Sequence, residues 1–445
     1  MCVMKLNKYF MIGAMGLSLV ACSDNLDENG QGANGTNPNE GTTYVAFTVD
    51  FKGTESRTIS NTGTDAERNV TTAYVMLVDG GKITAVVSKA DVTTSGQGYH
   101  SDEDKYLFQT TEGTHSFYAV INPDVVPTAG KSIDEYFNTA VVMGVEDTDG
   151  IAEADDFMMS SVEDVTFYVN DGIAEDDALA GAQNDEATNN VTVTVERVAA
   201  KVTVTAASNS ITGDAGGTIA NTKFYLNGGA TMSTRMAQAK IAEIQSNAWT
   251  YESGERDVHI GSYTDGEPNE ETPTVEPAYC LENLHTAYTQ GNTTYVTIST
   301  TFTPAKVVDC ADEIKSLKDN STTGTFYVVT AGELSGNYIM ASDLTNYQNG
   351  DNQKLPAGVD AISDAYNGGA CWFGPVWINL NDDATESPIV RNTWYNLNIT
   401  SIKLPGEPEV PTIDDPTWPL VPPTNVAVTL TIQPWNIVTH DVELK

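Results

Sequence analysis

Basic residues are scarce in this sequence. Its 445 residues include 22 Lys and Arg against 61 Asp and Glu, which gives a formal net charge of −39. A chain this acidic is repelled by nucleic-acid phosphates and by anionic membrane surfaces, so both are excluded as its partners. Hydrophobic residues make up 40% of the sequence, which is enough for packed cores. We therefore expect an acidic, folded protein of two or three domains.

Motifs for catalysis and metal binding are also missing. The sequence contains no G-x-S-x-G, H-E-x-x-H, Walker or G-x-G-x-x-G motif. Its 5 cysteines include no C-x-x-C pair, and its 5 histidines show no ligand-like spacing. The stretch 147–150 resembles the start of a calcium loop but lacks the later carboxylates. We expect no enzyme activity, no cofactor and no metal site. A glycosidase-like carboxylate pair among the many acids is the open alternative.

Residues 1–22 have the organisation of a signal peptide. A basic start precedes an apolar run of about 12 residues, which is too short to span a bilayer. The run ends in Leu-Val-Ala-Cys, a pattern similar to a bacterial lipobox, which predicts lipid attachment at Cys22. An ordinary signal peptide with a chance cysteine is the alternative. Residues 23–42 are rich in Asn, Gly, Asp and Glu, a composition typical of a flexible tether.

Three further cysteines follow the signal peptide. They are Cys280, Cys310 and Cys371. In an oxidising compartment an odd number of thiols allows at most one internal disulfide, and its partners cannot be deduced from the sequence.

The first segment after the tether alternates between apolar and polar residues. Its apolar face consists of Val45, Phe47, Val49 and Phe51. This period of two predicts a half-buried β-strand over 44–52. A polar stretch containing Arg57 and Arg68 follows. An exposed arginine in a flexible loop is a substrate for an Arg-specific protease, although a loop arginine without a role is the simpler interpretation.

β-Strands are expected to dominate the middle of the chain. The predicted strand runs are 106–109, 115–122, 165–169, 190–205, 293–303, 325–330 and 393–403. Helices are expected at 132–143, 234–249 and about 311–319. Two acidic segments are expected to be solvated loops, 146–156 and 171–187. Short strands between turn signals predict β-sandwich domains, which join near Val198.

The C-terminal region begins with seven prolines in residues 404–425. Such a segment is expected to be extended, unable to pair in a sheet and long enough to reach beyond one domain. It leads to a last strand whose apolar positions are Val426, Val428, Leu430 and Ile432. An apolar strand on such an arm invites pairing with another chain. The alternative is that the arm folds back and completes a sheet of its own chain.

The two ends of the chain carry matching apolar faces. If cleavage at Arg57 released the first strand, the last strand of a neighbouring subunit could fill its place by strand addition. Burial of four such side chains contributes about 6–12 kcal/mol before entropy costs. This interface is head-to-tail and does not close on itself, so its repetition would produce a filament.

Several segments resemble the fimbrillins of the type V pili of Bacteroidales. They are MKLNKYFMIGAMGLSL (4–19), VTVERVAAKVTV (193–204), SPIVRNTWYNLNITSIK (387–403) and the ending QPW followed by THDVEL (433–444). The resemblance is closest to the major stalk subunit of the short, Mfa-type fimbriae. It implies two transthyretin-like β-sandwich domains with an extended C-terminal donor-strand arm.

The resemblance also implies a division of the chain. Its parts are a signal peptide and lipobox (1–22), a tether and removable first strand (23–57), an N-terminal sandwich (58–198), a C-terminal sandwich (199–403), and the arm with its donor strand (404–445). Lipidation would fall on Cys22, proteolytic cleavage after Arg57 with Arg68 as the competing site, and strand donation on the segment that begins near Val426.

The partners and place of action follow from the same resemblance. It implies a head-to-tail polymer of identical or related fimbrial subunits, with anchor and tip pilins, at the outer membrane and cell surface. The precursor's lipid would contact the membrane, and the fibre would support adhesion and biofilm formation. A tip or anchor pilin is one alternative. A surface glycan-binding lipoprotein of a nutrient-uptake system is another, and it would expose some of Trp249, Trp372, Trp377, Trp394, Trp418 and Trp435.

Overall fold

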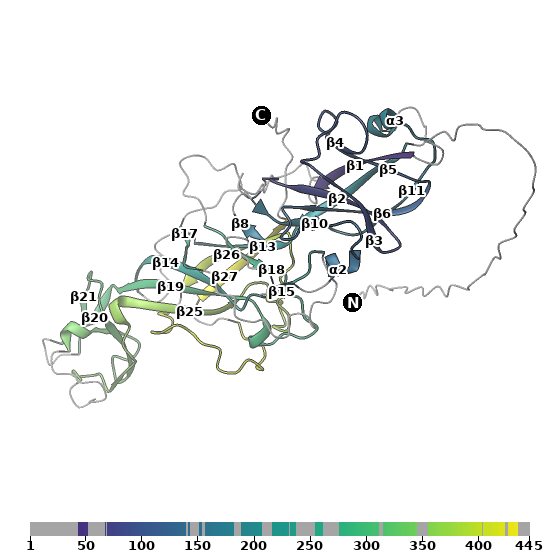
Figure 1. Ribbon diagram of the computed structural model, residues 1–445. Helices are drawn as coiled ribbons and strands as arrows, with labels where there is room; N and C mark the ends of the chain where they lie inside the picture. The colour runs from purple at the N-terminus through teal and green to yellow at the C-terminus, as the bar shows by residue number, and fades with distance from the viewer. Residues whose placement is uncertain are drawn as a thin grey trace, which may run out of the picture. The chain divides into compact units, whose positions relative to one another are not determined.

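The described part of the chain is almost entirely β-structure. A computed structural model (Figure 1) describes residues 43–51, 67, 69–138, 141–142, 151–153, 156–181, 188–206, 216–230, 232–236, 254–260, 276–310, 315–344, 355–402, 404–422 and 426–434. The α-helices among these residues are short, α2 (Ile133–Asn138) and α3 (Glu175–Ala180). The expected all-β fold class is confirmed. Within the same residues, none of the helices has the length and hydropathy needed to cross a membrane.

The first part of the chain forms a 9-stranded sheet. Its spatial order is β3 (Lys82–Ser88), β2 (Ala73–Asp79), β6 (Gly113–Ile121), β10 (Met159–Ser161), β12 (Asn190–Arg197), β1 (Thr43–Phe51), β5 (Lys105–Thr110) and β4 (Gly98–His100), and β11 (Val165–Val169) also pairs with β6. Strand β3 contacts β4 and β5 although they lie at the opposite end of this order. The sheet therefore curls around its core, as sheets with a strong twist do.

One hydrophobic core lies inside this curled sheet. Strands from both ends of the order contribute buried side chains to it, among them Val87, Leu77, Phe117, Phe108 and Tyr99. These residues come from β3, β2, β6, β5 and β4 in turn. A strand in the middle of the order, such as β1, is thus held by backbone pairing on both sides and by the core beneath it.

Two further sheets pack face to face in the second part of the chain. One has the order β17 (His259–Ile260), β13 (Ala199–Ala206), β26 (Thr393–Ile402) and β27 (Val426–Pro434), with β18 (Ala278–Leu281) also paired to β13. The other has the order β16 (Arg256–Asp257), β14 (Gly217–Asn227), β19 (Tyr295–Pro304) and β25 (Ala370–Trp377). Buried side chains from both sheets form one core, among them Val204, Leu397, Phe224, Ile298 and Phe373. This arrangement is a β-sandwich.

The remaining elements are short. Small sheets join β20 (Lys306–Val308) to β21 (Leu317–Asp319), β22 (Phe326–Ala331) to β23 (Tyr338–Met340) and β24 (Ala361–Ile362), β7 (Val141–Val142) to β15 (Met232–Ser233), and β8 (Ala152–Glu153) to β9 (Asp156–Phe157). The 3-10 turns are η1 (Gln290–Asn292), η2 (Ala341–Asp343) and η4 (Asn367–Gly369).

The strand predictions agree with this structure better than the helix and loop predictions. Every predicted strand run falls on a strand, namely β5, β6, β11, β12 with β13, β19, β22 and β26. The helix predicted over 132–143 is found only as α2, which ends at Asn138, and it is wrong at Val141–Val142, which form strand β7. The helix predicted over 311–319 is wrong at its end, because Leu317–Asp319 pairs with β20 as a strand. Most of 234–249 lies outside the described residues.

Both acidic segments expected to be loops contain regular structure. Helix α3 lies within 171–187 and begins with three acidic residues, which are favourable beside the positive end of a helix dipole. Its Ala178 and Leu179 are buried. In the described part of 146–156, Ala152 of β8 is buried as well. Charge density alone therefore misidentified these segments, because their few apolar residues pack inward.

The chain changes sheets near Val198, as the sequence suggests. Strand β12 ends at Arg197 in the first sheet, and β13 begins at Ala199 in the sandwich. Residues 41–445 nevertheless form one compact unit by their contacts. The division into two domains at this point stays a prediction.

Candidate functional site

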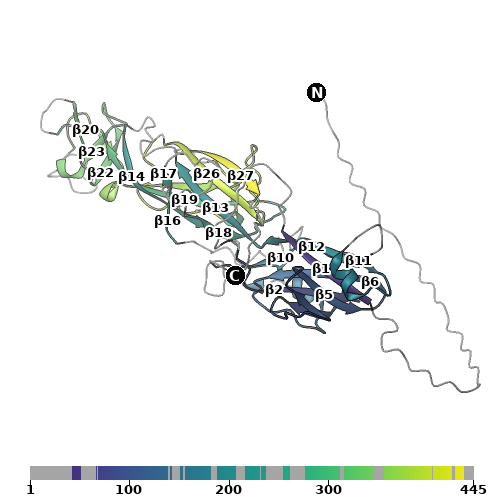
Figure 2. The same ribbon diagram turned by 90° about the horizontal axis from the view of Figure 1, so that it is seen from above.

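Strand β1 lies in the interior of the first sheet (Figure 2), between β12 and β5. It pairs in parallel with β12, from Ala46 opposite Asn190 to Phe51 opposite Val195. It pairs in antiparallel with β5, from Thr43 opposite Thr110 to Phe47 opposite Tyr106. Removal of β1 would therefore leave two open backbone edges that face each other. The predicted strand is confirmed, and its residues occupy a central place in the sheet.

One face of β1 points into the core. Val45 and Phe47 are completely buried there. The ring of Phe47 lies 5.0 Å from that of Phe117 and 6.3 Å from that of Phe108, within the range of favourable aromatic contacts. Val49 and Phe51 are partly buried against the same core. The apolar face predicted from the alternation is thus the face that packs inward.

The opposite face of β1 is covered at one point by α3. Ala46 is completely buried and belongs to a small apolar cluster with Leu107 of β5 and with Ala178 and Leu179 of α3. Alternation alone predicts that this face is solvent-exposed. A small side chain is required here, because a helix lies over the strand.

The start of β1 is held by a polar clasp, a group of hydrogen bonds among Thr43, Asn170, Ile173 and Asn189. Asn189 Nδ2 donates to Thr43 Oγ1 at 3.2 Å and to the Tyr44 carbonyl at 2.9 Å. The Thr43 hydroxyl donates to the Asn170 carbonyl at 2.7 Å and accepts from the Ile173 amide at 3.0 Å. Thr43 and Asn189 are both completely buried. Buried polar groups need such partners, so the clasp selects a hydroxyl-bearing residue at this position of the strand.

The residues predicted for processing flank this strand in the sequence. Cys22, Arg57 and Arg68 are outside the described residues. Glu67, which directly precedes Arg68, is described and is 1% exposed. Its Oε1 accepts from Lys201 Nζ at 2.7 Å and from the Tyr279 hydroxyl at 2.7 Å.

The environment of Glu67 favours its charged form. Burial acts to raise the pKa of this carboxyl group, but the Lys201 ammonium, the two hydrogen bonds and the nearby Arg197 guanidinium together lower it. Arg197 Nε and Nη2 also donate to the Glu67 carbonyl, at 3.2 and 3.0 Å. The chain is therefore anchored at Glu67, directly before Arg68.

The Pro-rich arm is attached to its own sandwich at its start. The backbones of Glu407 and Trp372 of β25 form a pair of hydrogen bonds, at 2.7 and 2.9 Å. The Tyr366 hydroxyl donates to the Gly406 carbonyl at 2.8 Å. Only glycine fits at position 406, because a Cβ atom there would lie 1.9 Å from the Trp372 carbonyl oxygen. The expectation that this segment cannot pair in a sheet is wrong at Glu407.

The later half of the arm is attached as well. The amides of Gln290 and Gly291 donate to the carbonyls of Trp418 and Pro416, both at 2.9 Å. Trp377 Nε1 donates to the Val421 carbonyl at 2.9 Å. The described part of the arm therefore follows the surface of its own sandwich.

The last strand completes a sheet of its own chain. Strand β27 pairs in antiparallel with β26, from Val426 opposite Ile402 to Pro434 opposite Thr393. Figure 2 shows this strand in yellow beside β26. It is the last strand in the order of its sheet. Of the two alternatives for the arm, the structure shows the folded-back one. The predicted displaced strand and the predicted donor strand are not brought together within one chain.

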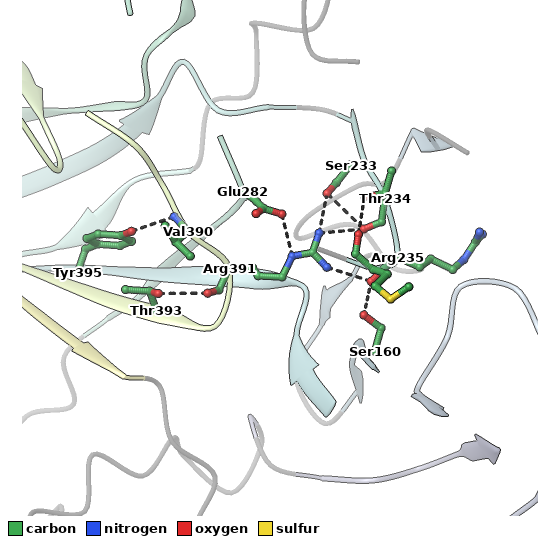
Figure 3. A network of polar contacts seen from close by, with 10 residues as sticks. Ser160, Ser233, Thr234, Arg235, Glu282, Val390, Arg391, Thr393 and Tyr395 are labelled. Atoms are coloured by element: carbon green, nitrogen blue, oxygen red, sulfur yellow. Dashed lines mark hydrogen bonds and ion pairs between the residues drawn. The ribbon is translucent and has the colours of Figure 1, made fainter. Parts of the chain in front are cut away.

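A buried polar network links the two parts of the chain (Figure 3). Arg391 donates from Nε to Glu282 at 2.8 Å and from Nη1 to the Arg235 carbonyl at 2.9 Å. That carbonyl also accepts from the Ser160 hydroxyl of β10. The Arg235 guanidinium binds both carboxylate oxygens of Asp124, at 2.7 and 2.8 Å.

Sequence reasoning missed these networks. Basic residues inside apolar strand runs were the available signal, as in VERVAAKV (195–202) and PIVRNTW (388–394). Such a residue is costly to bury without a partner, so its position implies one. The partners themselves, Glu67 and Glu282, lie far away in the sequence.

In the part of the chain that the structure describes, neither the cysteines nor the tryptophans suggest a further site. No disulfide joins Cys280, Cys310 and Cys371, all of which are described. Burial raises the pKa of the Cys310 thiol to about 11 and that of Cys371 to about 12, so neither is activated. Trp377 and Trp394 are buried, and Trp418 is 51% exposed. Trp249 and Trp435 lie outside the described residues.

Comparison with known proteins gives one family match. Residues 364–441 match the model of the major fimbrial subunit protein type IV, fimbrillin, C-terminal. This region contains β25, β26, the arm and β27. No curated protein matches the chain.

Several solved structures are similar at low identity. A fimbrilin from Porphyromonas gingivalis is 15% identical, with a TM-score of 0.47, and the match covers 90% of this chain and 99% of that one. A tip fimbrial protein from the same species is 13% identical, with a TM-score of 0.40 and coverages of 88% and 100%. A fimbrial assembly protein from Parabacteroides distasonis is 11% identical, with a TM-score of 0.32 and coverages of 81% and 91%. With TM-scores below 0.5, we draw no conclusion from these structures.

Proposed function

We propose that this chain is a structural subunit of a cell-surface fimbria, and that it polymerises when the last strand of one copy replaces the first strand of the next. The observation that carries this proposal is the interior position of β1, which joins β12 to β5. A removable strand at this position leaves a groove with two backbone edges and an apolar floor. Such a groove is a strong acceptor for strand addition. The fimbrillin match over residues 364–441 supports the fimbrial role.

The exchange is favourable for the donated strand. In its own chain, β27 ends a sheet and pairs with β26. In the place of β1 it would pair with two strands instead of one. Its four apolar residues would also fill the core positions of Val45, Phe47, Val49 and Phe51. Relative to exposed side chains, such burial contributes about 6–12 kcal/mol before entropy costs.

Cleavage after Arg57 is the step that makes β1 removable. The burial of Glu67 favours this site over Arg68. A protease must bind the residues on both sides of the bond that it cuts, so susceptibility depends on how deeply those residues are buried and bonded. Cleavage after Arg68 would require Glu67 to leave Lys201 and Tyr279. Cleavage after Arg57 leaves this anchor in place.

In the proposed maturation, the subunit is first a lipoprotein precursor. Lipid at Cys22 would hold the precursor at the outer membrane until the cut removes residues 22–57. The mature subunit would then join a head-to-tail fibre of identical or related subunits, with anchor and tip pilins at its ends. We assign the fibre no enzymatic step and no cofactor, and its role is adhesion and biofilm formation.

Two arginine variants test this function. We expect surface material from wild-type cells and from the Arg68→Ala control to show filaments by electron microscopy and a ladder of SDS-resistant oligomers. We expect Arg57→Ala to yield precursor monomer only. Filaments of normal abundance from Arg57→Ala would contradict the proposal. Monomers in all three strains, together with measurable oligosaccharide binding, would favour a surface glycan-binding lipoprotein.

A further inference from the structure

The first strand, β1, and the last strand, β27, share more than an apolar face. The first strand reads TYVAFTV from Thr43, and the C-terminal segment reads TNVAVTL from Thr424. With Val45 aligned to Val426, Thr, Val, Ala and Thr coincide at four of the seven positions. Thr424 and Asn425 lie outside the described residues, so they enter this comparison by sequence alone.

Three of the shared residues occupy places in the first sheet that accept only one kind of side chain. The Thr43 hydroxyl is buried in the clasp with Asn189 and Asn170. Val45 is buried in the core. Ala46 is buried beneath α3. The shared pattern therefore coincides with the hydroxyl-binding, apolar and small-residue positions of the groove.

We propose that the groove selects both the direction and the register of the incoming strand, and that the occupant is residues 424–432 of a second copy of this chain. This inference rests on the proposed function. The segment runs in the direction of β1, parallel to β12 and antiparallel to β5. Thr424 takes the place of Thr43 at the clasp, and Ala427 takes the place of Ala46 under α3.

In other registers, side chains of the donor strand do not match the positions of the groove. A shift by one residue turns the apolar face away from the core. A shift by two in one direction places Val426 at the clasp and Thr429 beneath α3, so the Asn189 amide loses a hydroxyl partner. A shift by two in the other direction places Thr424 in the core and Asn425 beneath α3. Each mismatch buries a polar group without a partner, which is unfavourable.

Cysteine pairs test the register directly. Thr48 lies opposite Thr192 and Asp50 lies opposite Thr194 in β12. In the proposed register these acceptor residues face Thr429 and Thr431 of the donor. We would introduce cysteines pairwise into the full chain, isolate surface filaments and oxidise them, because a direct disulfide forms only between cysteines whose Cα atoms lie within about 7 Å. Wild-type filaments, which retain the native cysteines, are the control.

The expected covalent ladders come from Thr192→Cys with Thr429→Cys and from Thr194→Cys with Thr431→Cys. The pair Thr192→Cys with Thr431→Cys reports a shift by two and should stay uncrosslinked. Filaments that crosslink through this shifted pair, or through none of the pairs, would overturn the register while the proposed function stands. Absence of wild-type filaments would overturn both.

The clasp has its own test. Thr424→Val removes the hydroxyl at nearly constant shape, and we expect about a tenfold loss of filament yield, because the Asn189 amide would lose a partner. Thr424→Ser keeps the hydroxyl and should restore the yield. Thr431→Val is the matched control in the same segment and should assemble like wild type. Equal yields from Thr424→Val and wild type would overturn the role of the clasp.

Discussion

At the scale of single residues, four of the scarce basic side chains make buried contacts. Arg197, Lys201, Arg235 and Arg391 are all buried in a chain of net charge −39. Each contacts a carboxylate or a backbone carbonyl from a distant part of the sequence. Loss of one partner from such a site is far more damaging than loss of a surface ion pair.

Glu67→Gln should therefore destabilise the protein. We expect the free energy of unfolding at pH 7 to fall by about 3 kcal/mol, because the variant removes the counter-charge of buried Lys201. Urea denaturation measures the loss. Glu333→Gln breaks the exposed pair with Lys315 and should cost no more than about 0.5 kcal/mol. Equal losses in the two variants would contradict this account of the anchor.

The Glu67 effect should also depend on pH. The pKa of Glu67 is lowered from 4.5 in the folded chain, so its charge stabilises the fold fully above pH 4.5. This stabilisation disappears as the pH falls through the lowered folded value. The stability gap between wild type and Glu67→Gln should thus be constant from pH 7 to about 5 and shrink in more acidic solution. A gap that does not change down to pH 3 would refute the assignment.

Gly406 provides a second residue-scale prediction. Gly406→Ala should loosen the arm, because the new Cβ atom would collide with the Trp372 carbonyl. We expect hydrogen exchange at the amides of Trp372 and Glu407 to become at least about tenfold faster. Gly324→Ala meets only the flexible end of Met340 and serves as the control. Unchanged protection in Gly406→Ala would show that the arm is held elsewhere.

At the scale of elements, the proposed maturation assigns β1 to the precursor and not to the mature subunit. Phe47→Ala should lower the stability of the precursor by about 3 kcal/mol, because a buried ring is lost from the core. The same change should leave the thermal stability of assembled filaments unaffected, since residue 47 precedes the cut. Phe117→Ala, which alters the same core in both forms, should weaken both. Filaments weakened by Phe47→Ala would mean that β1 is retained.

Local sequence patterns predicted the strands well, because alternation records which face is buried. The period of two over 44–52 identified β1 and its core-facing side chains. The same pattern could not reveal that Ala46 lies beneath α3 or that Asn189 holds Thr43. Those contacts join residues more than a hundred positions apart, and no local periodicity encodes them. The sequence left the course of the arm open for the same reason, since its partners Trp372 and Gln290 are set by the tertiary fold.

At the scale of the whole molecule, each subunit of the proposed fibre is strongly acidic. Removal of residues 1–57 takes six acidic and four basic residues from the chain of net charge −39, which leaves −37. Like-charged fibres repel at low salt, and this repulsion is screened within about 10 Å at 0.1 M ionic strength. We expect electron micrographs to show single fibres at low salt and more lateral bundles as salt is raised. Strand exchange depends on burial and hydrogen bonds, so the length of the fibres should stay the same. Bundling that is insensitive to salt would contradict this prediction.

The central claim is that β1 is cut off and replaced by a neighbour's last strand. The most direct measurement is the N-terminal residue of the protein isolated from the cell surface, determined on the bands of an SDS-resistant ladder. We predict a start at Thr58 in every band. A lipidated start at Cys22, in material that contains monomer alone, would mean that the first strand stays in its sheet and would contradict the account.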